Sequence, residues 1–148
     1  MILLAPLLFW IHIMEEASFG FMRWYNSVMT VHGSESGFLT ANLEPLLITA
    51  LLAAAVVWLP RKEPAFLLLV WLSYFMFANT IFHVTATLAL GRYCPGLVTA
   101  LMLYLPFYCW YTRYLGTRFS MHPATIAIVS LLAVGVVYVQ WHGPLFKN

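Results

Sequence analysis

The chain has 148 residues, of which 63% are hydrophobic, 17% are aromatic and only 8% are charged. Soluble domains carry about 25% charged residues, and a fold of this size has too little interior to hide so much apolar surface. The composition therefore predicts a protein that lies in a lipid bilayer. The net charge of +2 is too small to indicate a partner made of nucleic acid.

Five apolar segments separated by short polar connections predict an all-α membrane bundle of five transmembrane helices, forming one domain over residues 1–148. The expected helices cover about residues 2–25, 38–59, 65–90, 95–114 and 123–141. Each is near the ~20 residues that a helix needs to cross ~30 Å of hydrocarbon. Pro45 is expected in the first turn of the second helix, and Pro106 should bend the fourth.

Basic residues near the helix ends indicate the orientation. Four fall on the same side of the bundle as the amino terminus: Arg61, Lys62, Arg113 and Arg118. Three fall on the opposite side: Arg23, Arg92 and Lys147. Since basic residues concentrate on the cytoplasmic side, this distribution favours a cytoplasmic amino terminus in a multi-pass membrane protein.

Cys94 and Cys109 are the only cysteines. Within one helical segment they would lie ~20 Å apart along the axis. A disulfide requires Cα atoms within about 7 Å of each other, so we expect no disulfide within the chain.

Three ionisable residues interrupt the first apolar segment: His12, Glu15 and Glu16. A charged side chain at the bilayer centre costs roughly 2.5 to 3.5 kcal/mol, so such residues indicate a functional site. At ~100° per helical residue, His12 and Glu16 lie on one face, with Glu15 beside them. The spacing brings three side chains into one small volume.

Further polar residues lie at a matching depth in other helices. With a ~1.5 Å rise per residue, both Glu16 and Asn79 lie ~21 Å from the amino-terminal side, and His83 follows Asn79 by one turn on the same face. Asn42 and Thr99 belong to the first turns of helices that start from the opposite side. We therefore expect one polar cluster in that half of the bundle, formed by His12, Glu15, Glu16, Asn42, Glu44, Asn79, His83 and Thr99.

Arg23 lies two turns beyond Glu16 on the same stripe of the expected helix, where it would cap the cluster with positive charge. The last helix carries only Ser130 as a polar residue between Thr125 and Gln140, so it is expected to act as a scaffold.

The polar cluster admits three chemical interpretations. In the first, His12, Glu16 and His83 bind zinc, iron or manganese, with Asn79 as a further ligand or as a group behind the ligands. In the second, the paired carboxylates Glu15 and Glu16 perform acid–base chemistry without a metal. In the third, the same residues form the relay of a proton-coupled carrier or the site of a small-molecule binding protein. A polar network that only locks the first helix to the third is the structural alternative.

Three motifs in chain order make this sequence similar to the HXXEE family of small integral membrane proteins. They are His12-Ile-Met-Glu15-Glu16, Asn79-Thr-Ile-Phe-His83, and Tyr93-Cys-Pro95-Gly96-Leu-Val-Thr99. The resemblance covers nearly the whole chain. It marks the signature positions as His12, Glu15, Glu16, Asn79 and His83, and it implies no particular activity.

A more distant resemblance is to the CaaX-type intramembrane metalloproteases, which pair a Glu-Glu-x-x-x-Arg helix with a Phe-x-x-x-His helix. Here Gly20 stands where that family has the arginine, and Asn79 stands where it has the phenylalanine. The last helix also lacks a buried histidine. These differences argue against proteolysis and leave a metal site open.

The sequence thus favours a metal-dependent membrane enzyme that acts on a lipid or another apolar or amphiphilic small molecule. Glu15 and Glu16 are the expected catalytic residues, one as a metal ligand and the other as a general base, with His12 and His83 as further ligands. The expected substrate-binding residues are Asn42, Asn79, Thr99 and Arg23. Hydrolysis and oxidation both remain open. Glu16 rather than Glu44 is expected to be indispensable, because Glu16 shares a helix face with His12.

Overall fold

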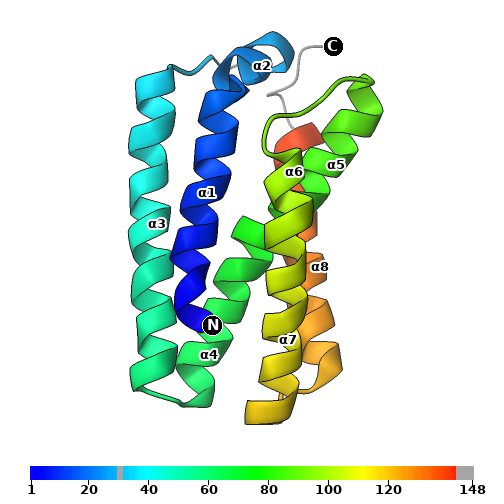
Figure 1. The fold of residues 1–148 in the computed structure, drawn as a ribbon. Helices are drawn as coiled ribbons and strands as arrows, with labels where there is room; N and C mark the ends of the chain where they lie inside the picture. Colours follow the sequence, from blue (N-terminus) through cyan, green and yellow to red (C-terminus); the bar gives the residue numbers. More distant parts are fainter. Residues whose placement is uncertain (30–31, 143–148) are drawn as a thin grey trace.

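The computed structural model describes residues 1–29 and 32–142, and every regular element in these ranges except for a single bridge position at Met29 is helical (Figure 1). The prediction of an all-α protein is therefore confirmed. The expected helix boundaries agree with the observed ones in most places. The first helix is broken at one glycine, the second and third each begin three residues earlier than expected, and the fourth ends five residues later, at Phe119. Two wide helical turns also interrupt the third and fourth helices.

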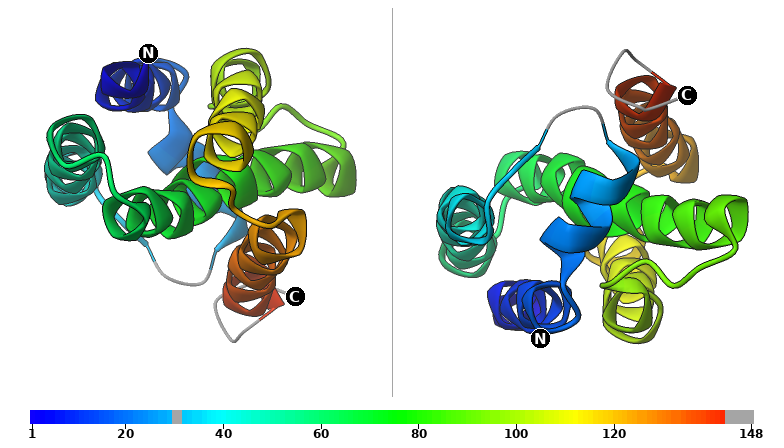
Figure 2. Two further views of the ribbon diagram at one scale, coloured as in Figure 1. Left: turned by 90° about the horizontal axis from the view of Figure 1, so that it is seen from below. Right: turned by 90° about the horizontal axis from the view of Figure 1, so that it is seen from above.

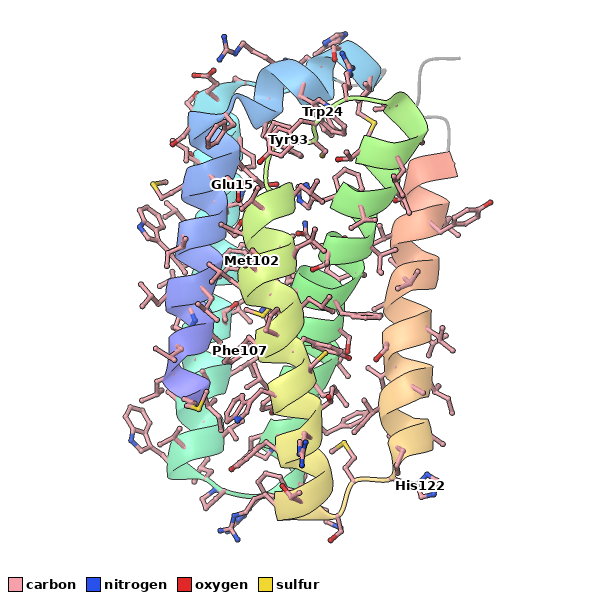
Figure 3. The ribbon with its side chains drawn as sticks, turned by 45° about the vertical axis from the view of Figure 1, so that its right-hand side comes forward. Glu15, Trp24, Tyr93, Met102, Phe107 and His122 are labelled. Carbon is pink, nitrogen blue, oxygen red and sulfur yellow. The ribbon has the colours of Figure 1, made fainter. Side chains whose placement is uncertain are left out.

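The first predicted helix is broken into two. A short turn, η1 (Ile2–Leu4), leads into α1 (Ala5–Ser18), and α2 (Phe21–Val28) follows at an angle of 68° to this first part. Gly20 stands at the break with φ 74°, a left-handed conformation that glycine adopts without a steric penalty. The prediction of one continuous helix over residues 2–25 is therefore wrong. Instead, α2 lies across the end of the bundle (Figures 1 and 3).

The second helix, α3 (Glu35–Trp58), packs beside α1. Ser34 caps its start, because the serine hydroxyl accepts a hydrogen bond from the Gly37 backbone N–H at 3.0 Å. Since the helix begins three residues earlier than expected, Pro45 lies inside it and not in its first turn. The outer face of α3 is apolar and exposed at Leu43, Leu47 and Leu51, among other residues.

The third helix runs through the middle of the bundle as one span, Lys62–Leu90 (Figure 2). It consists of α4 (Lys62–Leu72), a wider π-helical segment η2 (Ser73–Ala78) and α5 (Asn79–Leu90). It contacts α3, α7 and α8, and its side chains Leu68, Leu69, Leu72 and Met76 are fully buried in the main core. Gly91, with φ 61°, ends it.

The fourth helix also contains a π segment. A loop over residues 91–96 leads into α6 (Leu97–Thr99), the π segment η3 (Ala100–Tyr104) and α7 (Leu105–Phe119). Pro106 has no N–H to donate to the carbonyl of Met102, and a wide turn over this stretch accommodates the missing bond. The last helix, α8 (Pro123–His142), packs against η2 in the central span.

By length and apolar composition, two of the described helices could cross a membrane: α3 and the span Lys62–Leu90. A third is added if α1 and α2 count as one bent span, and α8 is apolar over Pro123–Val139 but shorter. The structure is thus compatible with a membrane protein, whereas the expected number of five crossings is not confirmed.

Candidate metal centre

Three of the predicted side chains meet between α1 and α5. His12 Nε2 lies 3.6 Å from Glu16 Oε1, and His83 Nε2 lies 3.3 Å from the same oxygen. The exposed fractions are 2% for His12, 5% for Glu16 and 0% for His83. The prediction that helical spacing and depth would bring these residues together is confirmed, and the trio could hold a metal ion.

The distances suit a small divalent cation. Zinc binds histidine nitrogen at about 2.0–2.1 Å and carboxylate oxygen at about 2.0–2.2 Å, so tetrahedral ligand atoms lie ~3.4 Å from one another. The two nitrogen–oxygen distances at Glu16 are close to this value, and all three ligand atoms lie within 4.8 Å of one another.

Thr99 holds His12 from its far side. The Nδ1 atom of His12 lies 2.8 Å from the Thr99 hydroxyl oxygen, and that oxygen lies 3.3 Å from the Gly96 carbonyl oxygen. In the tautomer whose Nδ1–H donates to Thr99 while the Thr99 hydroxyl donates to Gly96, the lone pair of His12 lies on Nε2, the atom that faces Glu16. This is the tautomer in which Nε2 can bind a metal ion.

His83 is held in the same way by Cys94. The Nδ1 atom of His83 lies 3.2 Å from the Cys94 sulfur, which also lies 3.9 Å from the Pro95 carbonyl oxygen. Burial, with smaller contributions from Glu16 and Glu15, raises the pKa of the Cys94 thiol, so the sulfur carries its proton at neutral pH and can accept from His83 Nδ1–H.

Both Nε2 atoms are buried, and neither has a hydrogen-bond partner within the described residues. When Nδ1 of each histidine carries the proton, both Nε2 atoms are acceptors. An unsatisfied buried polar group costs about 1–3 kcal/mol, and two such atoms that face the same carboxylate oxygen are unusual in a polar network built only for stability. Metal-binding histidines typically donate their other N–H to a neighbouring group, as His12 and His83 can do here.

Gly96 forms the wall behind the three ligands. A Cβ atom at this position would lie 2.6 Å from His83 Cε1 and 2.9 Å from both Glu16 Cγ and His12 Cε1. Its φ of 101° also lies in the region that favours glycine. Sequence analysis quoted Gly96 and Cys94 only as parts of a motif, and did not predict their contacts with the ligands.

Glu15 is engaged by the loop and not by the histidines. Its carboxylate accepts hydrogen bonds from the backbone N–H of Thr99 at 2.7 Å and of Val98 at 3.2 Å, and from the Tyr93 hydroxyl. The first two bonds satisfy N–H groups at the start of α6, where a negative charge is favourable. Burial and the nearby Glu15 raise the pKa of Tyr93 to about 12, which keeps its hydroxyl protonated as a donor. Figure 3 shows Glu15 and Tyr93 at the end of the bundle that carries α2.

A cavity of about 400 Å³ opens beside the ligands and includes His12 and Glu16 in its wall. The rest of the wall is mostly aromatic and comes from α1, α2, α3 and the central span, with Tyr104 from η3 and Val137 from α8. Of the predicted substrate-binding residues, Asn42 and Asn79 line this cavity. Asn42 also donates to the Phe38 carbonyl at 2.9 Å.

Other predicted residues lie elsewhere. Thr99 is not part of the cavity wall as described, and instead binds His12. Arg23 is exposed on α2, because the bend at Gly20 removes it from the stripe that carries Glu16, so the expectation that it caps the cluster is wrong. Glu44 is exposed on α3. Tyr104, which sequence analysis did not single out, lines the cavity and packs on His12 with ring centres 4.4 Å apart.

A family model described as a protein of unknown function with an HXXEE motif matches residues 3–111, and the chain therefore belongs to the HXXEE family. The matched region contains all three ligands and ends within α7. Comparison with curated proteins gave no match, and neither did comparison with solved structures.

Proposed function

We propose that this protein is a membrane-embedded, metal-dependent enzyme that acts on a lipid or another apolar small molecule, with His12, Glu16 and His83 as the metal ligands. The observation that carries the proposal is the pair of unpartnered Nε2 atoms that face one Glu16 oxygen at the wall of an aromatic cavity. A ligand set of two nitrogens and one oxygen leaves a coordination position for substrate or water, as in catalytic zinc sites.

A zinc, iron or manganese ion held there would supply Lewis-acid chemistry and activate water, so both hydrolysis and oxidation are compatible with the site. The chain itself contributes a dry cavity and fixed histidine orientations. Glu16 is the carboxylate ligand beside the two histidines. Glu15 instead accepts hydrogen bonds from the loop segment that orients His12 and His83. A metal-free enzyme with paired carboxylates has less support, because the two glutamates have different partners.

Elemental analysis of purified protein tests the metal site. We expect about one zinc, iron or manganese ion per chain in the wild type and close to none in His12→Ala and His83→Ala. His122→Ala is the matched control, because His122 is exposed at the opposite end of the bundle (Figure 3). This variant should keep its metal.

A protein without metal in every preparation would contradict the proposal. If such a protein also moved protons when a substrate was added to proteoliposomes, the proton-coupled carrier would be the better interpretation of the same three residues.

The proposed setting is a bilayer crossed by all five predicted helices, with the amino terminus in the cytoplasm. The structure supports this arrangement through its apolar helices and exposed leucines. The start of α4 and the end of α7 lie near one end of the bundle, and the start of α3 lies near the other (Figure 1). Lys62 and Arg118 belong to the first two of these helix ends, and Ser36 belongs to the third. In a Cys109→Ser background, an impermeant thiol reagent applied to intact cells should label Ser36→Cys but neither Lys62→Cys nor Arg118→Cys. Equal labelling at Ser36 and Lys62 would contradict this topology.

A further inference from the structure

Two further polar atoms at the cavity have no hydrogen-bond partner within the described part of the chain. They are the amide oxygen of Asn79 and the hydroxyl of Tyr104, and both are buried. Asn79 begins α5 and Tyr104 ends η3, so the two groups come from different helices to one cavity wall. Buried polar atoms are normally satisfied, and these two lie where a ligand could satisfy them.

The chemistry of these atoms limits the ligand. The Asn79 oxygen only accepts hydrogen bonds, so its partner must be an O–H or N–H donor. The Tyr104 hydroxyl can donate to an oxygen on the same ligand. An alcohol or an amide meets both requirements, whereas an ester offers acceptors alone.

The charge of the cavity wall limits the ligand further. Among the described residues of the wall, none is Lys or Arg, and Arg23 is exposed on α2. Apart from the proposed metal ion, a buried carboxylate or phosphate would therefore have no cation to pair with. A positively charged head would compete with the metal ion for Glu16. The side chains of this wall thus favour an uncharged head.

The remaining surface suits a hydrocarbon tail. Phenylalanines from α1, α2, α3 and the central span surround the polar groups, and the volume of about 400 Å³ lies within the range of small-molecule sites, roughly 300–1,000 Å³. One chain fits such a volume more readily than the two chains of a membrane phospholipid.

We infer that the substrate is a single-chain amphiphile whose uncharged head carries a hydrogen-bond donor, either a long-chain alcohol or a long-chain amide. The inference rests on the proposed function, since it names the substrate class of that site. The Asn79 oxygen accepts from the head group and the Tyr104 hydroxyl donates to it, which places the head beside His12 and Glu16.

Binding of labelled dodecanamide to the full-length protein in lipid nanodiscs tests the inference, with empty nanodiscs to correct for partitioning. Competitors with the same tail differ only in their heads. Dodecanamide and dodecanol should displace the label at concentrations about tenfold lower than methyl dodecanoate, dodecanoate or dodecyltrimethylammonium, because a site built around hydrogen bonds rejects ligands that lack them. Equal or stronger displacement by the ester, the anion or the cation would overturn the inference.

Two variants test whether Asn79 causes the head-group preference and whether Tyr104 binds the head group. Asn79→Leu should weaken dodecanamide binding about tenfold and leave methyl dodecanoate unchanged, because only the amide donates to the Asn79 oxygen. Tyr104→Phe should weaken both ligands, because both carry an oxygen that accepts from the Tyr104 hydroxyl. Tyr111→Phe is the control, because the buried Tyr111 hydroxyl donates to the Ala65 carbonyl at 2.9 Å and is not in the cavity wall. Survival of the full head-group preference in Asn79→Leu, or unchanged binding of both ligands in Tyr104→Phe, would contradict the assignment.

Metal content measured on the same samples separates the two proposals. Asn79→Leu should retain its metal, and loss of the ion would make Asn79 a metal ligand and overturn its role in substrate binding. Stoichiometric metal without a head-group preference would overturn the substrate class alone. A clear preference in a protein without metal would support the substrate class and overturn the metal-dependent function.

Discussion

Two buried polar clusters in this bundle differ in how well their atoms are satisfied. In the first, the Tyr108 hydroxyl lies 2.7 Å from the Ser73 hydroxyl and 2.6 Å from that of Ser130. Each serine hydroxyl also lies 2.7 Å from a backbone carbonyl oxygen one turn earlier in its own helix. The three hydroxyl protons satisfy three of these four contacts at once. This network joins the central span, α7 and α8. Ser130 is the polar residue that suggested a scaffolding role for the last helix, and its contacts agree with that role.

The second cluster, His12, Glu16 and His83, keeps acceptors without partners, although it is equally buried. A network built for stability satisfies its members, because each unsatisfied atom subtracts from a small net stability. The comparison shows that burial alone does not identify a site. What distinguishes a structural network from a binding site is whether each buried polar atom has a hydrogen-bond partner within the protein.

The loop over residues 91–96 and the helix start that follows explain how the unsatisfied cluster is maintained. Thr99 and Cys94 contact the Nδ1 atoms of the two histidines, Gly96 packs on His12, Glu16 and His83, and Glu15 holds Thr99 through its backbone N–H. The satisfied network needs no such support, since its hydroxyls bond to carbonyls of their own helices. The following predictions test this difference.

The largest effect is expected from Glu16→Gln. This substitution removes the ligand charge but keeps the side-chain volume, so metal content should fall from about one ion per chain to nearly none. The fold should persist or gain stability, because a buried charge no longer needs compensation. Elemental analysis and thermal unfolding in detergent measure the two quantities.

Glu44→Gln is the matched control for Glu16→Gln, because Glu44 is exposed on α3. It should leave metal content and stability unchanged. If Glu16→Gln kept its metal while Glu44→Gln lost it, the assignment of the site to α1 would be wrong.

The second largest effect is expected from Gly96→Ala. The added methyl group would overlap both histidines and Glu16, and the backbone conformation would be strained as well. Gly91→Ala shares the backbone strain, at about 1–2 kcal/mol, but has open space around the new methyl group. We expect the free energy of unfolding to fall by at least ~2 kcal/mol more in Gly96→Ala than in Gly91→Ala. Gly96→Ala should also lose its metal. If both variants lost the same free energy of unfolding and Gly96→Ala kept its metal, Gly96 would be needed only for the backbone turn.

The third effect is expected from Thr99→Val, which removes the acceptor of the His12 Nδ1–H but keeps the shape of the side chain. Loss of such a partner typically lowers metal affinity about 10- to 100-fold. Competition with a chelator of known affinity measures this change. Thr85→Val is the control, because the Thr85 hydroxyl bonds to carbonyls of its own helix on an exposed face. Equal affinities in the two variants would contradict the role of Thr99.

The contact between His12, Glu16 and His83 could be predicted from the sequence because it depends on regular helix geometry. Four-residue spacing places His12 above Glu16, and counting the rise from the helix ends brings Asn79 to the depth of Glu16, with His83 one turn further along the same face. The departures from regular geometry were missed. Gly20 stands in an apolar run where nothing indicates a left-handed turn, and its bend removed Arg23 from the cluster.

Other features were missed because they depend on contacts between distant segments. The π segments η2 and η3 shift the helical register next to Asn79 and Tyr104, and hydrophobic periodicity does not reveal a single wide turn. The role of Cys94 depends on the loop folding back onto His83, 11 residues earlier in the chain. A sequence pattern can therefore propose the ligands, but the groups that orient them become visible only in the folded chain.

The smallest effect is expected from a pair of tyrosine variants that compares the two clusters directly. Tyr108→Phe removes the hydroxyl that links Ser73 to Ser130, at an expected cost of about 1 kcal/mol for the one hydrogen bond that its proton donates. The cost is modest because both serines keep their bonds to backbone carbonyls. Metal content should not change. Thermal unfolding with elemental analysis of the same sample gives both values.

Tyr104→Phe removes a hydroxyl that has no partner in the described structure, on the same helix and one turn away. Without a hydrogen bond to lose, its stability should stay within about 0.5 kcal/mol of the wild type or increase. Removal of a tyrosine hydroxyl thus lowers the free energy of unfolding at the Tyr108 network but not beside the cluster of His12, Glu16 and His83. If Tyr104→Phe destabilised the protein as much as Tyr108→Phe, the Tyr104 hydroxyl would have a structural partner, and the distinction between the two clusters would fail at that residue.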